Sequence, residues 1–337
     1  MVRVSAGARL HFGFQNLSLA HDRLYGGVGV GLAEPRVAVR AESAEAVSVD
    51  AAADAMPAVG GAERADRDAA CRYAERAADV LDVPGAHVTV ERALPRHVGL
   101  GSGTQLALAT YAAVARANDV EPRPREHAPA LGRGGRSGVG VATFESGGFV
   151  VDARHPTARF TTSEPERGDW ETPPVVARHA LPTDWRFLLV VPDADAGRNG
   201  DVEAASMRSV VERADGGVAD AVAGTLTRTL LPAAATDDRQ RFADGVRELG
   251  RLNGTWYADE QGGVFRPPVG EVVESLARSD VVGGIGQSSW GPAVYALTDT
   301  DHVDAALDAA RDALDDAGVD GDTTAVDPAN TGARVTE

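Results

Sequence analysis

Apolar residues along this chain of 337 residues recur with two different spacings, which predict strands and helices in an irregular order. Short β-branched and apolar runs, which are typical of strands, occur at Val2–Leu10, Arg36–Ala41, Ala86–Arg92, Gly138–Glu145, Gly148–Asp152, Trp185–Val191, Ala293–Leu297 and Thr323–Val326. Apolar residues repeating every three or four positions, which indicate helices, occur at Arg64–Leu81, Thr104–Asn118, Pro124–Leu131, Val202–Arg213, Gly217–Leu230, Arg239–Leu252, Val269–Ser279 and Val303–Ala317. Because strands lead and helices are interleaved among them, we expect an α+β fold rather than a regular series of βαβ units.

The length of the chain predicts two domains. The segment Ala153–Pro182 is rich in Pro, Thr, Glu and Arg and has weak periodicity, so we expect it to connect them. We therefore predict an N-terminal domain over residues 1–165, a C-terminal domain over residues 166–327, and a frayed tail over residues 328–337. The short low-complexity patch Ala51–Gly61 is expected to be a surface loop.

Charge excludes several classes of partner. The chain has 50 acidic and 33 basic residues, a formal net charge of −17, and no lysine, so every strong cation is an arginine. This acid excess repels nucleic acids and anionic membranes, which we do not expect as partners. Acid spread along the whole chain predicts adaptation to a salty cytosol, as in a halophilic archaeon. With neither a signal peptide nor a long apolar span, the sequence predicts a cytoplasmic protein.

The absence of lysine also limits the chemistry. Schiff bases, lysine general bases and Walker-type phosphate loops are excluded, so an anionic substrate has to be held by arginine, backbone amides or a metal. The single cysteine, Cys71, cannot form an internal disulfide, and its helical context predicts a packing role.

A glycine-rich turn between the strand Ala86–Arg92 and the helix Thr104–Asn118 is the most informative motif. Three glycines alternate there with small residues, so the backbone can approach an anion at the positive end of a helix dipole. This order predicts a phosphate or pyrophosphate cradle, although a tight connection with no ligand is the alternative. A second glycine-rich turn, Gly283–Gly291, lies far along the chain, and we expect the two turns to form two walls of one site between domains.

The first turn, Pro95–Gly103, resembles the nucleotide phosphate loop of the GHMP kinase superfamily, and Gly284–Pro292 resembles its C-terminal glycine loop. The resemblance implies two domains. The N-terminal one would be like domain 2 of ribosomal protein S5, and the C-terminal one would be a ferredoxin-like α/β sandwich.

Other motifs are more specific. Ala8–Gly13, Tyr25–Leu32, Gly132–Asp152, the Gly-Leu-Gly-Ser-Gly-Thr-Gln run ending at Gln105, and Gly286–Pro292 are similar to the β-ribofuranosylaminobenzene 5′-phosphate synthase family. The resemblance implies a decarboxylating pentosyltransferase. It would condense phosphoribosyl pyrophosphate with 4-aminobenzoate or 4-hydroxybenzoate, release CO₂ and pyrophosphate, and serve methanopterin-type cofactor biosynthesis. It further implies a divalent metal, Mg²⁺, and a homodimer.

That reaction needs anion stabilisation for the leaving group, a clamp for the 5′-phosphate and a recognition group for the aromatic acid. Backbone amides, hydroxyls and two arginines separated by glycines suit phosphate, so we predict phosphate or pyrophosphate binding by Gly99, Leu100, Gly101, Ser102, Gly103, Thr104, Gln105, Arg133, Arg136 and Ser137. Other substrate contacts are predicted for Arg9, Gly26, Gly27, Gly286, Gln287, Ser288 and Ser289.

We predict catalytic roles for His11, Asp22 and Arg23. Arg9 and His11 lie two apart in a strand and therefore point to one face. Asp22 either binds a metal or a ribose hydroxyl, or forms a surface ion pair with Arg23. The acids Glu34, Glu145 and Asp152 lie near glycine turns and are candidate metal ligands. Their spacing is not diagnostic, so the sequence does not identify the metal ligand.

Two alternative functions remain at this stage. One is an ATP-dependent GHMP small-molecule kinase, which the absence of lysine disfavours because several such kinases pair Asp with Lys at the reacting hydroxyl. The other is a noncatalytic ligand-binding paralogue.

Overall fold

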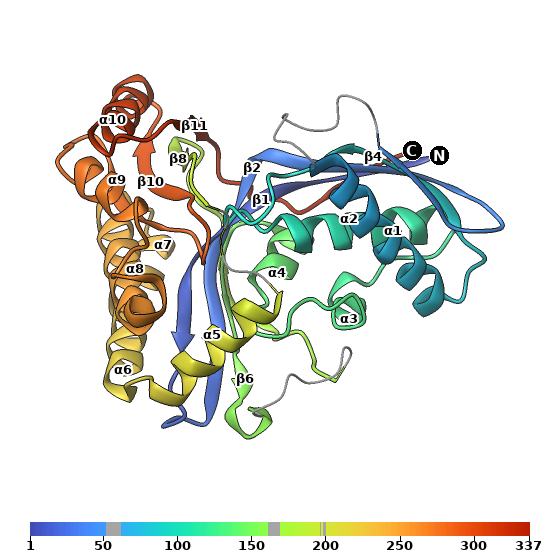
Figure 1. Cartoon of the computed structure of the whole chain (residues 1–337), viewed down its shortest axis with the longest axis horizontal. Helices are drawn as coiled ribbons and strands as arrows, with labels where there is room; N and C mark the ends of the chain where they lie inside the picture. The colour runs from blue at the N-terminus through green and yellow to red at the C-terminus, as the bar shows by residue number, and fades with distance from the viewer. Residues whose placement is uncertain (52–61, 161–168, 196, 198–199) are drawn as a thin grey trace.

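The computed structural model describes residues 1–51, 62–160, 169–195, 197 and 200–337, and it confirms the α+β fold. Two sheets lie side by side with helices packed against them (Figure 1). In the first sheet the strands are ordered β12-β1-β2-β4-β3, β5 and β6 also pair with β2, and β7 pairs with β5. Its strands are β1 (Val2–Asn16), β2 (Arg23–Ser43), β3 (Ser48–Ala51), β4 (Ala86–Arg92), β5 (Phe149–Asp152), β6 (His155–Pro156), β7 (Val175–His179) and β12 (Arg334–Thr336).

The first two strands are longer than the sequence predicted. Strand β2 already includes the glycine-rich segment 26–31, whereas the sequence predicted a strand only over Arg36–Ala41. Glycine is needed within β2 because neighbours approach its backbone closely: a Cβ at Gly29 would collide with the carbonyl of Leu10 and lie 2.8 Å from Val139 Cγ1. Close packing against β1 and the helix that begins at Val139 therefore explains why a strand segment has a glycine-rich sequence that is otherwise typical of a turn.

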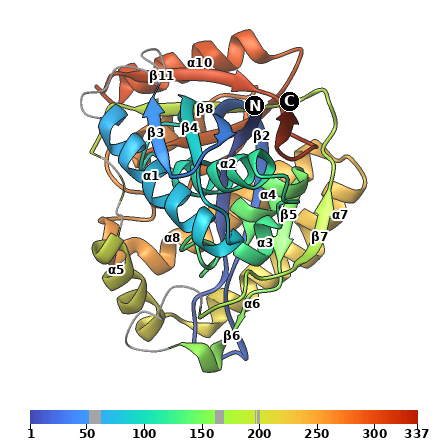
Figure 2. The same cartoon turned by 90° about the vertical axis from the view of Figure 1, so that its right-hand side faces the viewer.

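Helices α1 (Ala62–Leu81) and α2 (Ser102–Ala117) cover one face of this sheet (Figure 2), followed by α3 (Pro124–His127) and α4 (Val139–Ser146). The prediction of a strand at Gly138–Glu145 was wrong, because this segment forms α4. Its apolar residues are buried as expected. The buried carboxylate of Asp152 accepts a hydrogen bond from the Gly138 amide at the helix start (2.7 Å), a distant contact that local β-propensity cannot register.

The second sheet is antiparallel with strand order β11-β8-β10-β9. The chain runs from β8 through helices to β9 and β10, then through α10 to β11, which is the ferredoxin-like βαββαβ order. Its strands are β8 (Trp185–Pro192), β9 (Gly283–Gln287), β10 (Val294–Asp299) and β11 (Gly321–Val326). The helices of this half are α5 (Gly200–Arg213), α6 (Gly216–Thr225), a π-helical turn (Leu226–Leu230), α7 (Leu231–Ala235), α8 (Arg239–Gln261), α9 (Val269–Leu276) and α10 (Val303–Asp316).

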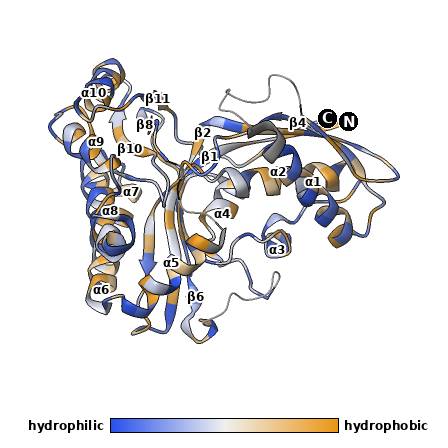
Figure 3. Ribbon diagram, viewed as in Figure 1, coloured by the Kyte–Doolittle hydropathy of each residue, from blue (hydrophilic) through white to orange (hydrophobic). Residues whose placement is uncertain are grey.

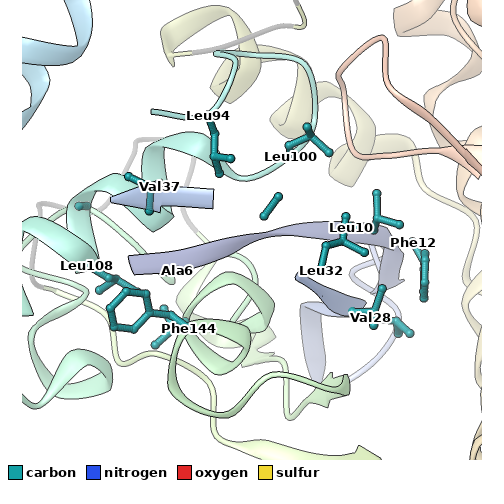
Figure 4. Close-up of a cluster of buried hydrophobic side chains, with 14 of the residues drawn as sticks. Ala6, Leu10, Phe12, Val28, Leu32, Val37, Leu94, Leu100, Leu108 and Phe144 are labelled. Atoms are coloured by element: carbon teal, nitrogen blue, oxygen red, sulfur yellow. The ribbon is translucent and has the colours of Figure 1, made fainter. Parts of the chain in front are cut away.

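The two faces of strand β8 contribute side chains to two different hydrophobic clusters. Leu188 and Val190 pack against α9 and α10, whereas Phe187 and Leu189 join the main core, as the two-residue period of a strand requires. An aromatic cluster in that core joins the two sheets, with Phe12 of β1 5.1 Å from the ring of Tyr295 of β10. Aliphatic side chains continue the core under the first sheet (Figure 4), and polar colouring is concentrated on outward helix faces (Figure 3).

The C-terminal tail is not frayed, contrary to the prediction for residues 328–337. Strand β12 pairs with β1, and Pro328 forms a bridge to Leu32. The side chain of Asn330 also accepts a hydrogen bond from the Leu181 amide and donates one to the Leu181 carbonyl. Both chain ends therefore lie together at one edge of the first sheet (Figure 1).

The domain limits themselves stay a prediction. Strand β7, which follows residue 166, pairs with β5 of the first sheet. Most of the predicted loop Ala51–Gly61, and residues 161–168 of the predicted connection, lie outside the described residues. In the part of the chain that the structure describes, no helix is both long and apolar enough to span a bilayer.

Two histidines are buried in the first sheet, and burial holds both in the neutral form. Desolvation, together with the charge of Arg9, lowers the pKa of His11 from 6.5 to about 3. Burial likewise lowers the pKa of His155 to about 4. A histidine with a lowered folded-state pKa contributes stability that is complete above pH 6.5 and is lost as the pH falls toward the folded value, because the unfolded chain takes up the proton first.

We therefore expect acid to destabilise the protein partly through His11. Its contribution to the free energy of unfolding should fall by about 2 kcal/mol between pH 7.5 and pH 5. Denaturant melts at both pH values should show a smaller pH-dependent loss for His11→Gln than for the unsubstituted protein. His87→Gln, at a half-exposed site on β4, is the control. Equal losses in all three proteins would contradict this role for His11.

Candidate functional site

The first glycine loop leads directly into the N-terminus of α2. Gly99 and Gly101 have positive φ angles of 99° and 78°, which glycine adopts without strain. Gly101 is the N-cap, and no side chain caps the helix start. Because an uncapped first turn points free amides outward at the positive end of the helix dipole, this loop has the geometry of an anion site.

The two glycine loops meet at the Gly99 carbonyl. The Ser288 hydroxyl donates to this oxygen (2.7 Å) and accepts a hydrogen bond from the His11 amide (3.1 Å). Arg9 Nη1 donates to the same carbonyl (2.6 Å). A Cβ at Gly291 would collide with the backbone of Val98, so the second loop lies directly on the first.

The outer edge of β1 supplies partners to both loops. Arg9 donates its amide to the Leu100 carbonyl (3.1 Å), and His11 donates to Ser288. A β-bulge between His11 and Gly13 then shifts the alternation by one residue. The next outward amide is that of Phe14, which donates to Asn253 Oδ1 of α8 (2.6 Å), while Asn253 Nδ2 donates to the Phe14 carbonyl.

The two arginines predicted to bind phosphate point to different places. The Arg133 guanidinium lies over the Tyr73 ring, 5.4 Å from its centroid, and donates to the Tyr73 hydroxyl. It also borders the glycine loop, because a Cβ at Gly103 would be 2.9 Å from Arg133 Nη2. Arg136 instead pairs with Glu203 of α5 (3.1 Å) and hydrogen-bonds to Tyr25.

Other predicted phosphate ligands are engaged in packing. Gln105 is fully buried and donates its side-chain amide to the Gly140 carbonyl of α4 (2.9 Å). Thr104 also lies against Gly140, where an added Cβ would be 3.0 Å from Thr104 Cγ2. These two side chains join α2 to α4. In the loop, Leu100 is buried in the hydrophobic core, and Ser102 is the first residue of α2.

The Gly26–Gly27 segment of β2 is held by the Asp152 side chain. The carboxylate accepts hydrogen bonds from the amides of Gly27 (2.8 Å), Gly138 and Arg154, so both of its oxygens have backbone partners. Burial raises the pKa of Asp152, and these hydrogen bonds oppose that shift. Ser137 lies nearby, with its hydroxyl 3.2 Å from His11 Nε2.

Asp22 and Arg23 lie at a separate place. Both are exposed and border a hollow of about 210 Å³ with His21, Arg154 and the start of α6. Arg23 donates to the carbonyls of Ala153 and Arg154. Arg23 lies four positions before Gly27 in β2, a span of about 13 Å. The described residues around the Asp22–Arg23 pair include none from the two glycine loops, so the structure does not bring this predicted pair to them.

The second loop lines a small hollow of about 30 Å³. Gln287 accepts a hydrogen bond from the Arg266 amide, and the Gly286 backbone lies against the Tyr295 hydroxyl. Trp290 is buried and packs on Tyr257, with ring centroids 4.4 Å apart. This space suits one or two waters rather than an aromatic acid, so Trp290 has a packing role here. Ser289 closes the hollow and donates its amide to the His11 carbonyl.

Sequence reasoning missed an ionic cluster beside the first loop. Asp66 of α1 is only 4% exposed, and its Oδ1 accepts from Arg96 Nη1 (3.0 Å). Burial raises the pKa of Asp66 although Arg96 opposes the shift, and burial together with Arg96 lowers the pKa of His97. The available signal was an aspartate on the apolar face of a predicted helix, next to Ala69 and Ala70.

Among the described residues, no group of three or more His, Cys, Asp or Glu side chains is placed to hold a metal ion. Glu145 pairs with Arg125 (2.6 Å), and Glu34 faces Arg92 on the surface. The site is therefore dominated by backbone amides and arginines, with single carboxylates at its borders.

Comparisons with known proteins agree with this fold. Residues 67–148 match the model of the GHMP kinases N terminal domain, and residues 230–316 match that of the GHMP kinases C terminal domain. Mevalonate diphosphate decarboxylase from Staphylococcus aureus has a similar structure (TM-score 0.67, 14% identity, covering 100% of this chain and 99% of that one). Homoserine kinase from Cytophaga hutchinsonii is also similar (TM-score 0.62, 15% identity, covering 99% and 97%). At these identities the likeness concerns the fold alone.

Sequence relatives are more specific. The chain is 32% identical over 308 residues to the β-ribofuranosylphenol 5′-phosphate synthase of Methanothermobacter thermautotrophicus, covering 88% of each chain. It is 30% identical over 303 residues to the protein of the same name from Archaeoglobus fulgidus, covering 89% of this chain and 88% of that one. The chain therefore belongs to the β-ribofuranosylphenol 5′-phosphate synthase family, on the two-domain fold of the GHMP kinases.

Proposed function

We propose that this protein is a decarboxylating pentosyltransferase that joins phosphoribosyl pyrophosphate to 4-hydroxybenzoate. The observation that carries the proposal is the 32% identity over most of the chain to an enzyme named for a ribofuranosylphenol 5′-phosphate. A phenol product favours 4-hydroxybenzoate over 4-aminobenzoate, because the acceptor's para substituent is retained when its carboxylate leaves. The role in methanopterin-type cofactor biosynthesis belongs to this proposal.

In the proposed reaction, the ring carbon that bears the carboxylate bonds to C1 of the ribose. The bond between C1 and the pyrophosphate oxygen breaks, and its electron pair leaves with the pyrophosphate. The electrons of the ring–carboxylate bond then return to the ring as CO₂ departs. Negative charge thus develops on the leaving diphosphate, which is where preorganised donors lower the barrier most.

The separation of the two arginines fits a donor that is charged at both ends. Arg133 borders the first turn of α2, so we place the pyrophosphate against it and the amides of Gly101–Gly103. Arg136 has different partners, Glu203 and Tyr25, and we place the 5′-phosphate there, in competition with Glu203. His11 is neutral at physiological pH because of its low pKa, so it acts as a hydrogen-bonding group and not as a cation.

Magnesium fits this arrangement as a companion of the substrate. Mg²⁺ commonly binds through one or two carboxylates together with substrate phosphates, and single carboxylates border the loops. When bound, it would neutralise charge on the leaving diphosphate. We further propose that the enzyme acts in a salt-rich cytoplasm, for which the net charge of −17 without lysine is the support. The homodimer is proposed on the family resemblance alone.

The first test is turnover. Purified protein in molar KCl with Mg²⁺ should release both CO₂ and pyrophosphate from phosphoribosyl pyrophosphate and 4-hydroxybenzoate, with a lower rate for 4-aminobenzoate. Carboxyl-labelled acceptor and a coupled pyrophosphate assay measure the two products. Phosphorylation of a small alcohol by ATP would favour a kinase instead, and donor binding without turnover would favour a noncatalytic paralogue.

The second test concerns the pyrophosphate clamp. Arg133→Ala should raise the apparent KM for the donor by roughly tenfold or more, since a hydrogen bond to a charged group contributes about 1.5–3 kcal/mol. The KM for the aromatic acid should change little. Steady-state kinetics with each substrate varied in turn measures this split. Arg228→Ala, on the exposed surface of the π-helical turn, is the matched control. A donor KM equal to that of the control would remove Arg133 from the clamp.

A further inference from the structure

Two buried atoms of charged side chains beside the first glycine loop, where Gln105 Oε1 is also unpaired, have no hydrogen-bond partner within the described part of the chain. One is Oδ2 of Asp66, an acceptor, and the other is Nε of Arg133, a donor. Leaving such groups unpaired away from water costs free energy, most of all for an ionised side chain. Their presence at the edge of a proposed anion site therefore points to a missing ligand.

Contacts among the neighbouring residues place both atoms in one cluster. Asp66 and Tyr73 lie seven residues apart on α1, about two helical turns, and so share one face. Tyr73 bonds to Arg133, and Asp66 bonds to Arg96 at the start of the loop. The charges of Asp66 and Arg133 both act on the pKa of His97, the residue after Arg96. The face of α1 that carries Asp66 and Tyr73 therefore contacts Arg96 at the start of the loop and, through Arg133, lies near the first turn of α2.

The two unpaired atoms require opposite charges. A carboxylate oxygen without a partner calls for a cation or a proton donor, whereas a guanidinium N–H calls for an anion. One ligand that supplies both is a diphosphate carrying a divalent metal. On the basis of the proposed function, we propose that Asp66 contacts the divalent cation of the donor's diphosphate, while Arg133 binds the phosphate oxygens.

The other nearby acids are less available. Both oxygens of Asp152 are held by backbone amides. Glu203 already forms an ion pair with Arg136 (3.1 Å). Burial raises the pKa of Asp66, and a bound divalent cation would favour its ionised form and offset that cost. Asp66 therefore combines a position beside the loop with an oxygen that has no competing partner.

The experiment uses pyrophosphate alone as the probe, so no turnover is needed. Calorimetric titrations of the full-length protein are compared in Mg²⁺ and in EDTA. We expect Mg²⁺ to strengthen pyrophosphate binding by about tenfold or more in the unsubstituted protein, and this gain to disappear in Asp66→Asn, since loss of even an indirect metal partner costs 10–100-fold. Asp68→Asn, an exposed acid on the same helix, should retain the gain.

A second variant separates metal binding from loop positioning. Arg96→Gln removes the partner of Asp66 and should weaken pyrophosphate binding while the gain from Mg²⁺ persists. If Asp66→Asn weakens binding equally in Mg²⁺ and EDTA, Asp66 only positions Arg96 and the proposal is wrong. A wild-type affinity that does not respond to Mg²⁺ would also overturn it. Turnover measured separately distinguishes these outcomes from failure of the proposed function, because a metal-independent transferase would still release pyrophosphate.

Discussion

Hydrogen bonding along the outer edge of β1 is the constraint on which the site depends. Three successive outward amides, from Arg9, His11 and Phe14, bond to the first glycine loop, the second glycine loop and α8. These partners, Leu100, Ser288 and Asn253, come from three distant parts of the sequence. Because a buried backbone amide must be paired, shifting any one of them would leave an unpaired group, so the strand edge fixes the relative position of the two halves.

Glycine makes this convergence possible at only a few positions. The Ser288 carbonyl occupies the space that a side chain at Gly99 would need, and the Val98 backbone occupies that of Gly291. Backbones in contact at this distance leave no room for a Cβ. The glycines therefore have two roles: some let the loops pack on each other, and Gly103 leaves space in which the Arg133 guanidinium reaches the start of α2.

The sequence predicted the α+β fold, both glycine loops and their encounter, because turn chemistry and family motifs are local. It failed where a distant group decides the outcome. The Asp152 carboxylate of β5 accepts a hydrogen bond from the backbone at the start of α4. The tail that was expected to fray forms β12, which pairs with β1. Asp22 and Arg23 were predicted to be catalytic, but they lie at a separate hollow whose described residues include none from either glycine loop. Asp66 was missed because its importance lies in a tertiary contact with Arg96.

A chain without lysine has to position every cation at its site through a guanidinium. Each arginine around the loops is held by a different partner: Arg9 by the Gly99 carbonyl, Arg96 by Asp66, Arg133 by Tyr73, and Arg136 by Glu203. A guanidinium has five N–H donors in a planar fork, so one or two bonds can fix its orientation and leave others for a ligand. An ammonium held by a similar contact would be less well oriented. Charge at this site is thus preorganised by paired arginines, which suits a diphosphate whose charge grows during the reaction.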